Sequence, residues 1–573
     1  MHDMLREYYH RALHALGYKT ERKFISEAIE RIEASWGEKN LFVIEAPTGY
    51  GKTTITASLA LMTCEEAGKL IVAYPLRTLL EDQYSKLRNV VNDLRLGKRY
   101  MHEESSPYLI KPITLTTVDT LSLTMFGLAP EDLNVVVRGW EEDRFVNTSR
   151  GHYLFSWSSV MMSDIVLDEV HLVAEESKSL TFLVAMLEHI ISHDQRVVFM
   201  TATMPTRFKE LILGSLRRFR DRVEWMEFRS TAVDDEYIAT CLEKRPEIRI
   251  QQLSSDTKFD VIKSWLDDAL ERGFSRVLVV FNTVGEAVSF YRTLDGYENR
   301  LLIHSRFTES DKLAKHERLQ RLKSEGKYIV VATQVVEAGL DLSSNALITD
   351  LAPMCSIIQR FGRLLRYEGE REGVAYVWYE SDLGRDRQLY KVYDRGLSAA
   401  TLDALREAER GNVSLHVPSG ERGYKRLLDK VYQDADLRIN YREIEEMLSV
   451  FTNLDDISKA VDLFFKMEGS FVRESALVPV RCPEMKEEVS VEMRVFERLL
   501  KEGLVKGHIV RNGEEEICEL PDWLSIGSKI QQRSLARKVI KHIHTAGVKA
   551  FIVEGSYNSE YGLEIEEALR EHV

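Results

Sequence analysis

The feature that most restricts the fold of this chain is a glycine-containing segment, APTGYGKTT (46–54), between an apolar run and a helical pattern. The apolar run, LFVIE (41–45), predicts a buried parallel strand. A loop of this composition between a strand and a helix is typical of a phosphate-binding loop. Gly49 and Gly51 let backbone N–H groups approach phosphates, and the following helix presents its positive end. The segment therefore predicts an α/β fold with a nucleotide site at a strand end.

The polar residues of this loop suit a nucleotide bound with magnesium. The Lys52 side chain can reach the terminal phosphates, and the Thr53 hydroxyl can bind the metal. The first position is Ala46, where the strict pattern has glycine. The predicted nucleotide-binding residues of the loop are Thr48, Gly49, Tyr50, Gly51, Lys52, Thr53 and Thr54.

Short β-branched runs recur along the chain in two series. The first series continues with KLIVAYP (69–75), DIVLDE (164–169) and VVFMTAT (197–203). The second consists of RVLVVFN (276–282), RLLIHS (300–305), YIVVATQ (328–334), ALITDLA (346–352) and GVAYVWY (373–379). This repetition predicts two parallel α/β sheets in tandem.

The divisions between these units follow from composition. Residues 229–260 are mixed and polar, which predicts the connection between the two sheets. From about residue 400 the chain is charge-rich with a helical pattern, so we expect a mostly helical C-terminal domain. The predicted units are a first lobe at 1–230, a second lobe at 231–400 and an accessory domain at 401–573.

Charge and cysteine content limit the classes of partner and compartment. Lys and Arg total 77 against 91 Asp and Glu, a net charge of -14, so any nucleic-acid contact must be a local groove. The five cysteines are scattered without C-x-x-C spacing, which argues against a disulfide framework and a zinc site and favours a reducing cytoplasm. We find neither a signal peptide nor about 18 uninterrupted apolar residues, so we expect no export and no membrane contact.

The second chemical motif is DEVH (168–171), which closes the strand DIVL (164–167). This position places two adjacent carboxylates at the carboxyl edge of the sheet, where ligands of α/β folds gather. We expect Asp168 to hold magnesium and Glu169 to orient and deprotonate the attacking water. His171 is then a candidate for coupling this site to its neighbours.

The third motif is an arginine cluster, QRFGRLLR (359–366). On a helix, Arg363 and Arg366 would share one face. If this helix belongs to the second lobe, both arginines could enter the cleft and stabilise charge on the transferring phosphoryl group. Closure and opening of the lobes would then follow ATP binding and hydrolysis.

These motifs, together with AYPLRTL (73–79), TTVD (116–119), TATMP (201–205), IHSRF (303–307) and VATQVVEAGLDL (331–342), occur in the order found in superfamily 2 helicases. ATQVVEAGLD with QRFGRLLR most resembles the CRISPR-associated helicase of type I interference systems. The resemblance covers about residues 20–370 and implies two RecA-like lobes that use ATP and magnesium. It further implies single-stranded DNA as the track, and a CRISPR surveillance complex with guide RNA and a separate HD-type nuclease as partners.

The resemblance also implies roles for individual residues. Phosphate and magnesium contacts fall on Lys52, Thr53, Asp168 and Glu169, and a coupling role falls on Thr201 and Thr203. A nucleotide contact is implied at Gly339 and Asp341, and phosphate sensing at Gln359, Arg363 and Arg366. The residues implied to line a single-strand track are Arg77, Thr117, Asn282, Arg306, Thr333 and Gln334.

One position departs from the family pattern. Ser26 stands where the family usually has a glutamine that reads adenine. A serine lacks the reach and the paired donor and acceptor of an amide, so strict selection of ATP over GTP is not expected from this residue.

Two alternatives to a DNA translocase remain at this stage. The first is an RNA helicase or a DNA-repair translocase that uses the same lobes, and the second is a nucleotide-switched clamp or protein-remodelling ATPase. We also expect no nuclease activity, because a fused HD domain needs a helical body of its own ahead of the phosphate loop. His2-Asp3, His10 and His14 precede that loop within 45 residues, and His193-Asp194 falls inside the first lobe, where the spacing leaves no room for a metal-binding bundle.

Overall fold

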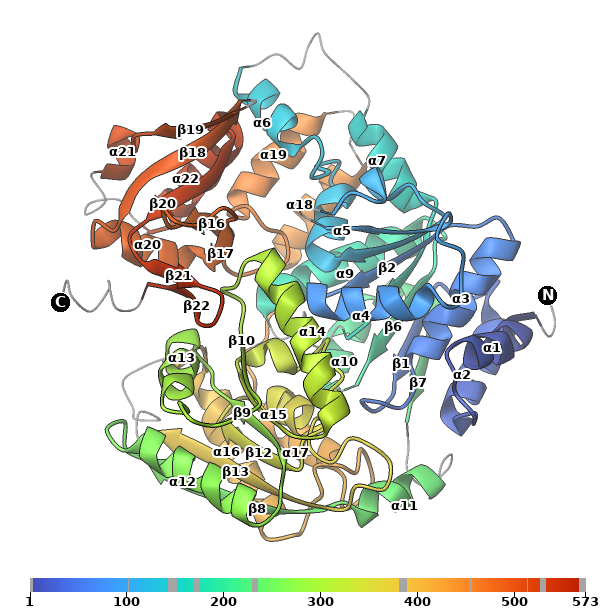
Figure 1. Cartoon of the computed structure of the whole chain (residues 1–573). Helices are drawn as coiled ribbons and strands as arrows, with labels where there is room; N and C mark the ends of the chain where they lie inside the picture. The colour runs from blue at the N-terminus through green and yellow to red at the C-terminus, as the bar shows by residue number, and fades with distance from the viewer. Residues whose placement is uncertain are drawn as a thin grey trace.

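Two parallel sheets lie one after the other along the chain in the computed structural model (Figure 1). The structure describes residues 4–100, 103–142, 152–169, 176–202, 204–228, 235–380, 389–452, 456–512, 514–525 and 532–565. Figure 1 shows the first lobe on the right, the second lobe below it, and most of the C-terminal region at the upper left, with the first two helices of that region beside the second lobe.

The first sheet has the strand order β3-β4-β2-β5-β6-β1-β7, and all its pairings are parallel. Its strands are β1 (Leu41–Glu45), β2 (Leu70–Tyr74), β3 (Leu96–Arg99), β4 (Ile113–Thr117), β5 (Asp164–Leu167), β6 (Val197–Thr201) and β7 (Val223–Glu227). The helices of this part of the chain are α1 (Met4–Ala15), α2 (Lys23–Ser35), α3 (Thr53–Glu65), α4 (Arg77–Leu87), α5 (Val118–Met125), α6 (Leu133–Glu141), α7 (His152–Met161), α9 (Ser177–Ser192) and α10 (Thr206–Ser215).

The second sheet has the order β10-β11-β9-β12-β13-β8 and is also parallel throughout. Its strands are β8 (Arg245–Leu253), β9 (Arg276–Val280), β10 (Arg300–Ile303), β11 (Tyr328–Ala332), β12 (Ala346–Asp350) and β13 (Glu372–Glu380). The accompanying helices are α11 (Asp235–Glu243), α12 (Lys258–Glu271), α13 (Val284–Arg292), α14 (Glu309–Glu325) and α15 (Met354–Phe361).

All the strands predicted from apolar runs are present, and both tandem sheets are confirmed. The connecting stretch is shorter than the predicted 229–260, because residues 245–253 form β8 at the edge of the second sheet. This strand alternates partly buried and exposed residues, as expected for an edge strand with one covered face. The Tyr237 ring of α11 packs on Tyr50 and Phe228 of the first lobe.

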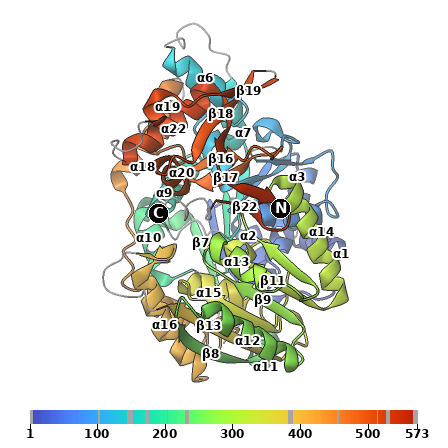
Figure 2. The same ribbon diagram turned by 60° about the vertical axis from the view of Figure 1, so that its left-hand side comes forward.

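The C-terminal region is helical in its larger share but also holds a mixed sheet that the sequence analysis did not predict. The helices are α16 (Arg395–Glu409), α17 (Tyr424–Tyr432), α18 (Tyr441–Thr452), α19 (Ile457–Lys466), α20 (Met493–Lys501), α21 (Asp522–Ser525) and α22 (Gln532–Ala546). The sheet has the order β17-β16-β20-β18-β19 and comprises β16 (Leu477–Arg481), β17 (Val489–Glu492), β18 (Val505–Asn512), β19 (Glu514–Cys518) and β20 (Val548–Val553). Two hairpins, β14–β15 (389–390 and 393–394) and β21–β22 (556–558 and 562–564), form separate two-stranded sheets. Figure 2 shows this sheet above the second lobe, with α16 beside β13.

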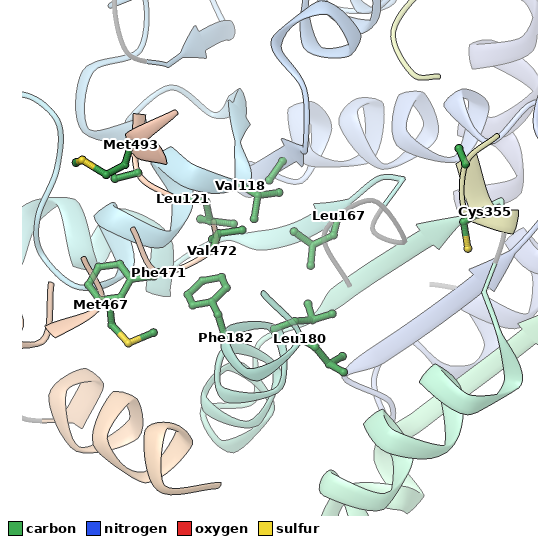
Figure 3. Packing of buried hydrophobic residues seen from close by; sticks show 14 of the residues in the cluster. Val118, Leu121, Leu167, Leu180, Phe182, Cys355, Met467, Phe471, Val472 and Met493 are labelled. Atoms are coloured by element: carbon green, nitrogen blue, oxygen red, sulfur yellow. The ribbon is translucent and has the colours of Figure 1, made fainter. Parts of the chain in front are cut away.

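The C-terminal region is held to the first lobe by a shared apolar core (Figure 3). Helix α18 packs on α9, while α19 and α22 pack on α6. The Phe126 ring stacks on Phe451 with centroids 4.3 Å apart and on Phe471 at 3.9 Å. Arg473 adds a two-point ion pair with Asp119, both N–O distances being 2.8 Å. The part of the C-terminal region that begins at α18 is therefore packed against the first lobe.

Two general properties of the described ranges bear on the sequence expectations. None of their helices is both long enough and apolar enough to cross a bilayer. Their five cysteines, Cys64, Cys241, Cys355, Cys482 and Cys518, are free thiols.

We predict that Phe126→Ala loosens this shared core. The Phe126 side chain is fully buried, and truncation of a buried phenylalanine costs about 3–5 kcal/mol through lost burial and the cavity left behind. The midpoint of the first urea unfolding transition should fall clearly below that of wild type. Leu94→Ala, at a side chain that is 82% exposed, is the matched control. Equal midpoints for the two variants would contradict this account of how the C-terminal region is held.

Candidate active site in the cleft between the lobes

The phosphate loop follows β1 at the carboxyl edge of the first sheet. Gly49 and Gly51 have φ of 77° and 102°, the left-handed region in which a side chain would be strained. The Ala46 N–H donates to the Thr201 carbonyl at 3.0 Å, so the loop begins directly beside the end of β6. Helix α3 begins at Thr53, and its amino end faces the loop as the sequence predicts.

The loop lysine lies against the carboxylates of DEVH. Lys52 Nζ is 3.4 Å from Glu169 Oε1, and it donates to the carbonyls of Ala46 at 3.1 Å and Pro47 at 3.4 Å. The Asp168 carboxylate accepts from the Glu169 N–H at 2.9 Å. Glu169 has φ of 53°, an uncommon conformation for a non-glycine residue, and such strain often occurs at functional sites. The structure therefore brings Lys52, Asp168 and Glu169 together.

The charge balance of this cluster fits a divalent cation. Burial raises the pKa of Asp168, the neighbouring Glu169 raises it further, and Lys52 opposes both. Two adjacent carboxylates with one buried lysine leave negative charge that a cation would compensate. Asp168 and the Thr53 hydroxyl offer the oxygen ligands that Mg²⁺ prefers. The residues present thus fit the magnesium site predicted at Thr53 and Asp168.

The second lobe closes the other side of this cleft. Thr48 Oγ1 in the loop donates to Gln359 Oε1 of α15 at 3.3 Å. Gly339 also meets the first lobe, because a Cβ there would lie 2.4 Å from the Leu79 backbone nitrogen of α4. Only glycine permits that approach at its φ of 84°. Two of the residues predicted from the second lobe, Gln359 and Gly339, therefore touch the first lobe.

The arginines are arranged differently from the prediction. Helix α15 ends at Phe361, so Arg363 and Arg366 do not share a helical face. Arg363 is buried and donates to the carbonyls of Val336 at 2.9 Å and Glu337 at 2.8 Å. Arg366 Nε pairs with Asp341 Oδ1 at 3.3 Å. The helix stops because Gly362 and the following residues turn into a bridge between Ser344 and Leu364.

A third arginine of this motif has a structural role that the sequence analysis did not assign. The Arg360 side chain is fully buried and donates to Glu337 Oε1 at 2.8 Å, Thr349 Oγ1 at 2.9 Å and Asn282 Oδ1 at 2.9 Å. It thereby ties the segments after β9 and β11 to strand β12. A three-residue spacing of arginines carries no signal that distinguishes this structural arginine from Arg363 and Arg366.

The residues predicted to line a strand track fall into two groups. Thr117, Asn282 and Thr333 are buried, and the Thr117 hydroxyl caps α5 by accepting from the Thr120 N–H at 3.3 Å. Arg77, Arg306 and Gln334 are partly exposed. Arg77 lies over the Tyr100 ring at 4.2 Å and pairs with Glu309 of the second lobe at 2.6 Å.

The remaining predicted residues lie partly inside and partly outside the described ranges. His171 and Thr203 lie outside the described residues, as do His2 and Asp3. The His193-Asp194 dipeptide ends α9, where His193 Nδ1 contacts the His189 carbonyl at 2.8 Å and Asp194 pairs with Arg222 at 2.5 Å. Within the described ranges, no group of three or more His, Cys, Asp or Glu residues has a metal-binding arrangement. The Ser26 hydroxyl donates to Glu21 at 2.9 Å.

Comparisons with known proteins agree on the type of domain. Residues 23–211 match the DEAD/DEAH box helicase family, and residues 274–369 match the C-terminal family of the CRISPR-associated nuclease/helicase Cas3. No HD-domain family matches the chain. A CRISPR-associated helicase Cas3 from Thermoproteus tenax is 26% identical over 438 residues, which cover 74% of this chain and 67% of that protein.

Solved structures show the same fold. The crystal structure of T. fusca Cas3-AMPPNP has a TM-score of 0.56 at 18% identity and covers 82% of this chain and 60% of its own. A chain of the pre-nicking CRISPR RNA-guided surveillance complex has a TM-score of 0.54 at 19% identity and covers 82% and 58%. The protein thus spans about three fifths of the length of these solved chains. The likeness confirms the two RecA-like lobes.

The motifs, the cleft and both family matches lead to one assignment. The chain carries a DEAD/DEAH box helicase domain over residues 23–211 and a Cas3-like C-terminal domain over residues 274–369, and it is homologous to Cas3 helicases.

Proposed function

We propose that this protein is an ATP-driven translocase on single-stranded DNA that unwinds target DNA in type I CRISPR interference. The observation that carries the proposal is the two-sided cleft, in which Lys52, Asp168 and Glu169 of the first lobe face Gln359 of the second across the loop residue Thr48. A site completed by both lobes can make hydrolysis depend on lobe closure. The T. fusca Cas3 structure with AMPPNP supports ATP as the ligand.

Each cleft residue has a definite task in this proposal. Lys52 leaves the loop carbonyls to neutralise the terminal phosphates, and Thr53 with Asp168 holds the magnesium, which supplies charge stabilisation. Glu169 orients the attacking water and accepts its proton. Arg363 now binds two carbonyls of its own lobe, so its guanidinium must leave them to stabilise charge on the phosphoryl group. Gln359 and Arg366 contact the terminal phosphate and so respond to its presence.

The strand track and the partners belong to the same proposal. Arg77, Arg306 and Gln334 supply the partly exposed donors, with buried Thr117, Asn282 and Thr333 shaping the strand ends behind them. The likeness to a chain of a CRISPR RNA-guided surveillance complex supports such a complex as the partner. A separate HD-type nuclease would do the cutting, and the free thiols suit the cytoplasm.

We predict that Glu169→Gln stalls hydrolysis while nucleotide and strand still bind. An amide cannot accept the proton of the attacking water, so kcat should fall by about 10²-fold or more. Lys52→Ala should instead weaken nucleotide binding. Glu66→Gln, at the exposed end of α3, is the control, because it makes the same Glu-to-Gln change away from the site. The measurement is steady-state phosphate release beside fluorescent-nucleotide binding. Normal turnover by Glu169→Gln would place the general base elsewhere.

ATP turnover with different strands tests the proposal as a whole. We expect single-stranded DNA to stimulate turnover at least about tenfold, since only a bound strand completes lobe closure. Equal stimulation by RNA would favour an RNA helicase, and no stimulation by any strand would favour a nucleotide-switched clamp.

Salt titration locates the track. The logarithm of DNA affinity should fall with the logarithm of salt, and Arg306→Ala should make that slope shallower by about 1. Arg217→Ala, at an exposed arginine of the first lobe, should leave the slope unchanged. An unchanged slope for Arg306→Ala would remove that residue from the track.

We also predict that the purified protein does not cut DNA. The His193-Asp194 dipeptide forms a helix-ending turn with Arg222 rather than a metal cluster. Labelled single-stranded DNA should therefore stay intact with manganese, nickel or cobalt, with or without ATP. Metal-dependent degradation that disappears in His193→Ala/Asp194→Ala would contradict this expectation.

A further inference from the structure

Helix α17 of the C-terminal region lies between the motif-bearing parts of both lobes. It follows the second lobe in sequence, yet it packs against α10 of the first lobe as well as α15 of the second. Its Tyr432 ring meets Phe208 of α10 edge to face at 5.6 Å. Lys425 and Asp429 stand four residues apart on this helix, so they share one face.

Lys425 reaches beneath the phosphate loop. Its Nζ is 2.6 Å from Glu45 Oε1, and it also donates to the Met204 carbonyl. Glu45 is the last residue of β1 and is only 6% exposed. The pKa of Glu45 is raised by burial, and Lys425 opposes that shift. The lysine thus stabilises a buried carboxylate directly before the loop.

Asp429 holds the same region from the other side. Its Oδ1 accepts from the Thr206 N–H at 2.7 Å, at the first residue of α10. A carboxylate at this position satisfies a free helix N–H and favours the positive end of the helix. Residues 204–206 run from the end of TATMP into the start of α10. They are therefore bound at both ends by α17, with the Met204 carbonyl on Lys425 and the Thr206 N–H on Asp429.

The contact leaves little space. A cavity of about 20 Å³ is the gap between α17, the end of β1 and the start of the loop, which is room for about one water molecule. Movement of α17 relative to the first lobe must therefore disturb Glu45 or residues 204–206. Interiors packed this closely transmit displacement rather than absorb it.

We propose that Lys425 and Asp429 are positioning residues that couple ATP hydrolysis to strand movement by clamping residues 204–206 against α17. The inference rests on the proposed translocase function and extends it to the C-terminal region. Hydrolysis at the loop shifts the end of β1 and the start of α10, and α17 passes that shift to α15 of the second lobe. Both residues lie on α17, outside the phosphate loop and DEVH.

The test compares variants that break one contact at a time. Lys425→Met removes the cation from Glu45, and Asp429→Ala removes the acceptor from Thr206. Lys425→Arg and Asp429→Asn keep a donor and an acceptor respectively, so they should rescue function. Lys430→Met is the matched control on the same helix, because Lys430 pairs with the surface residue Glu407 at 2.7 Å.

The readouts are the KM for ATP, the ratio of DNA-stimulated to basal turnover, and ATP consumed per nucleotide travelled. For Lys425→Met and Asp429→Ala we expect a KM within about twofold of wild type and a stimulation ratio at least about fivefold lower, the size expected from one lost cap or ion pair. The Glu45→Gln/Lys425→Met double variant should regain thermal stability, because no buried charge is left alone. Its stimulation ratio should stay low.

Three outcomes would overturn the inference. The first is a stimulation ratio in both single variants equal to that of Lys430→Met, and the second is a ratio fully restored in the double variant. If no strand stimulates the wild-type protein, the proposed translocase function fails. The contacts of Lys425 can then still be tested by amide hydrogen exchange. Peptides covering 200–210 should exchange faster in Lys425→Met than in Lys430→Met, and equal exchange is the third overturning outcome.

Discussion

The parallel pairing of β1 between β6 and β7 is the constraint on which the cleft depends. It sets Glu45 in register with Thr201 on one side and Glu227 on the other, so three strand ends that carry polar side chains lie abreast. The phosphate loop starts one residue later, beside the Thr201 carbonyl. A shift of one residue in this pairing would move the loop away from DEVH and turn its strand's side chains to the opposite faces.

That register also brings acidic side chains close together in a buried place. Burial raises the pKa of Glu45, and the neighbouring Glu227 raises it further. A cation placed beside Glu45 is therefore favourable. Lys425 supplies it from a part of the chain 380 residues away. In the second lobe, a buried cation likewise binds acceptors from different parts of the chain. The Arg360 guanidinium donates to acceptors of three segments. Breaking such buried pairs on one side costs about 3–5 kcal/mol, which makes both cations organising elements.

Sequence patterns predicted the parts of this structure that depend on short-range signals. The nine apolar runs became strands because continuous burial on both faces requires them to be apolar. Strands β3 (LGKR) and β4 (ITLTT) went unpredicted because their polar composition resembles a loop, although both are paired in the sheet. Edge strand β8 lies in the polar stretch 229–260, and this composition predicts a connection rather than a strand.

The cleft was predictable to a similar extent, and its limits have a physical cause. Loop and carboxylate motifs are local, so Lys52, Asp168 and Glu169 could be assigned together. The orientation of Arg363 depends on where α15 ends, and that is decided by the turn at Gly362 and the bridge from Ser344 to Leu364. Lys425 and Asp429 carry no motif at all, because their partners Glu45 and Thr206 are brought to them only by the folded chain.

The placement of the C-terminal region changes how the two lobes can move. Helices α18, α19 and α22 share a core with the first lobe, in which Phe126 stacks on Phe451 and Phe471, whereas α16 packs on β8 and α15 of the second lobe. Hairpin β21–β22 also meets the second lobe, where the Leu563 N–H donates to the Arg306 carbonyl at 2.9 Å. A rotation of one lobe against the other must therefore either carry these contacts along or break them. Since the apolar core is the larger and more deeply buried contact, the polar contact at Arg306 is the one that can give way during each cycle, whereas the buried contacts of α17 are carried along.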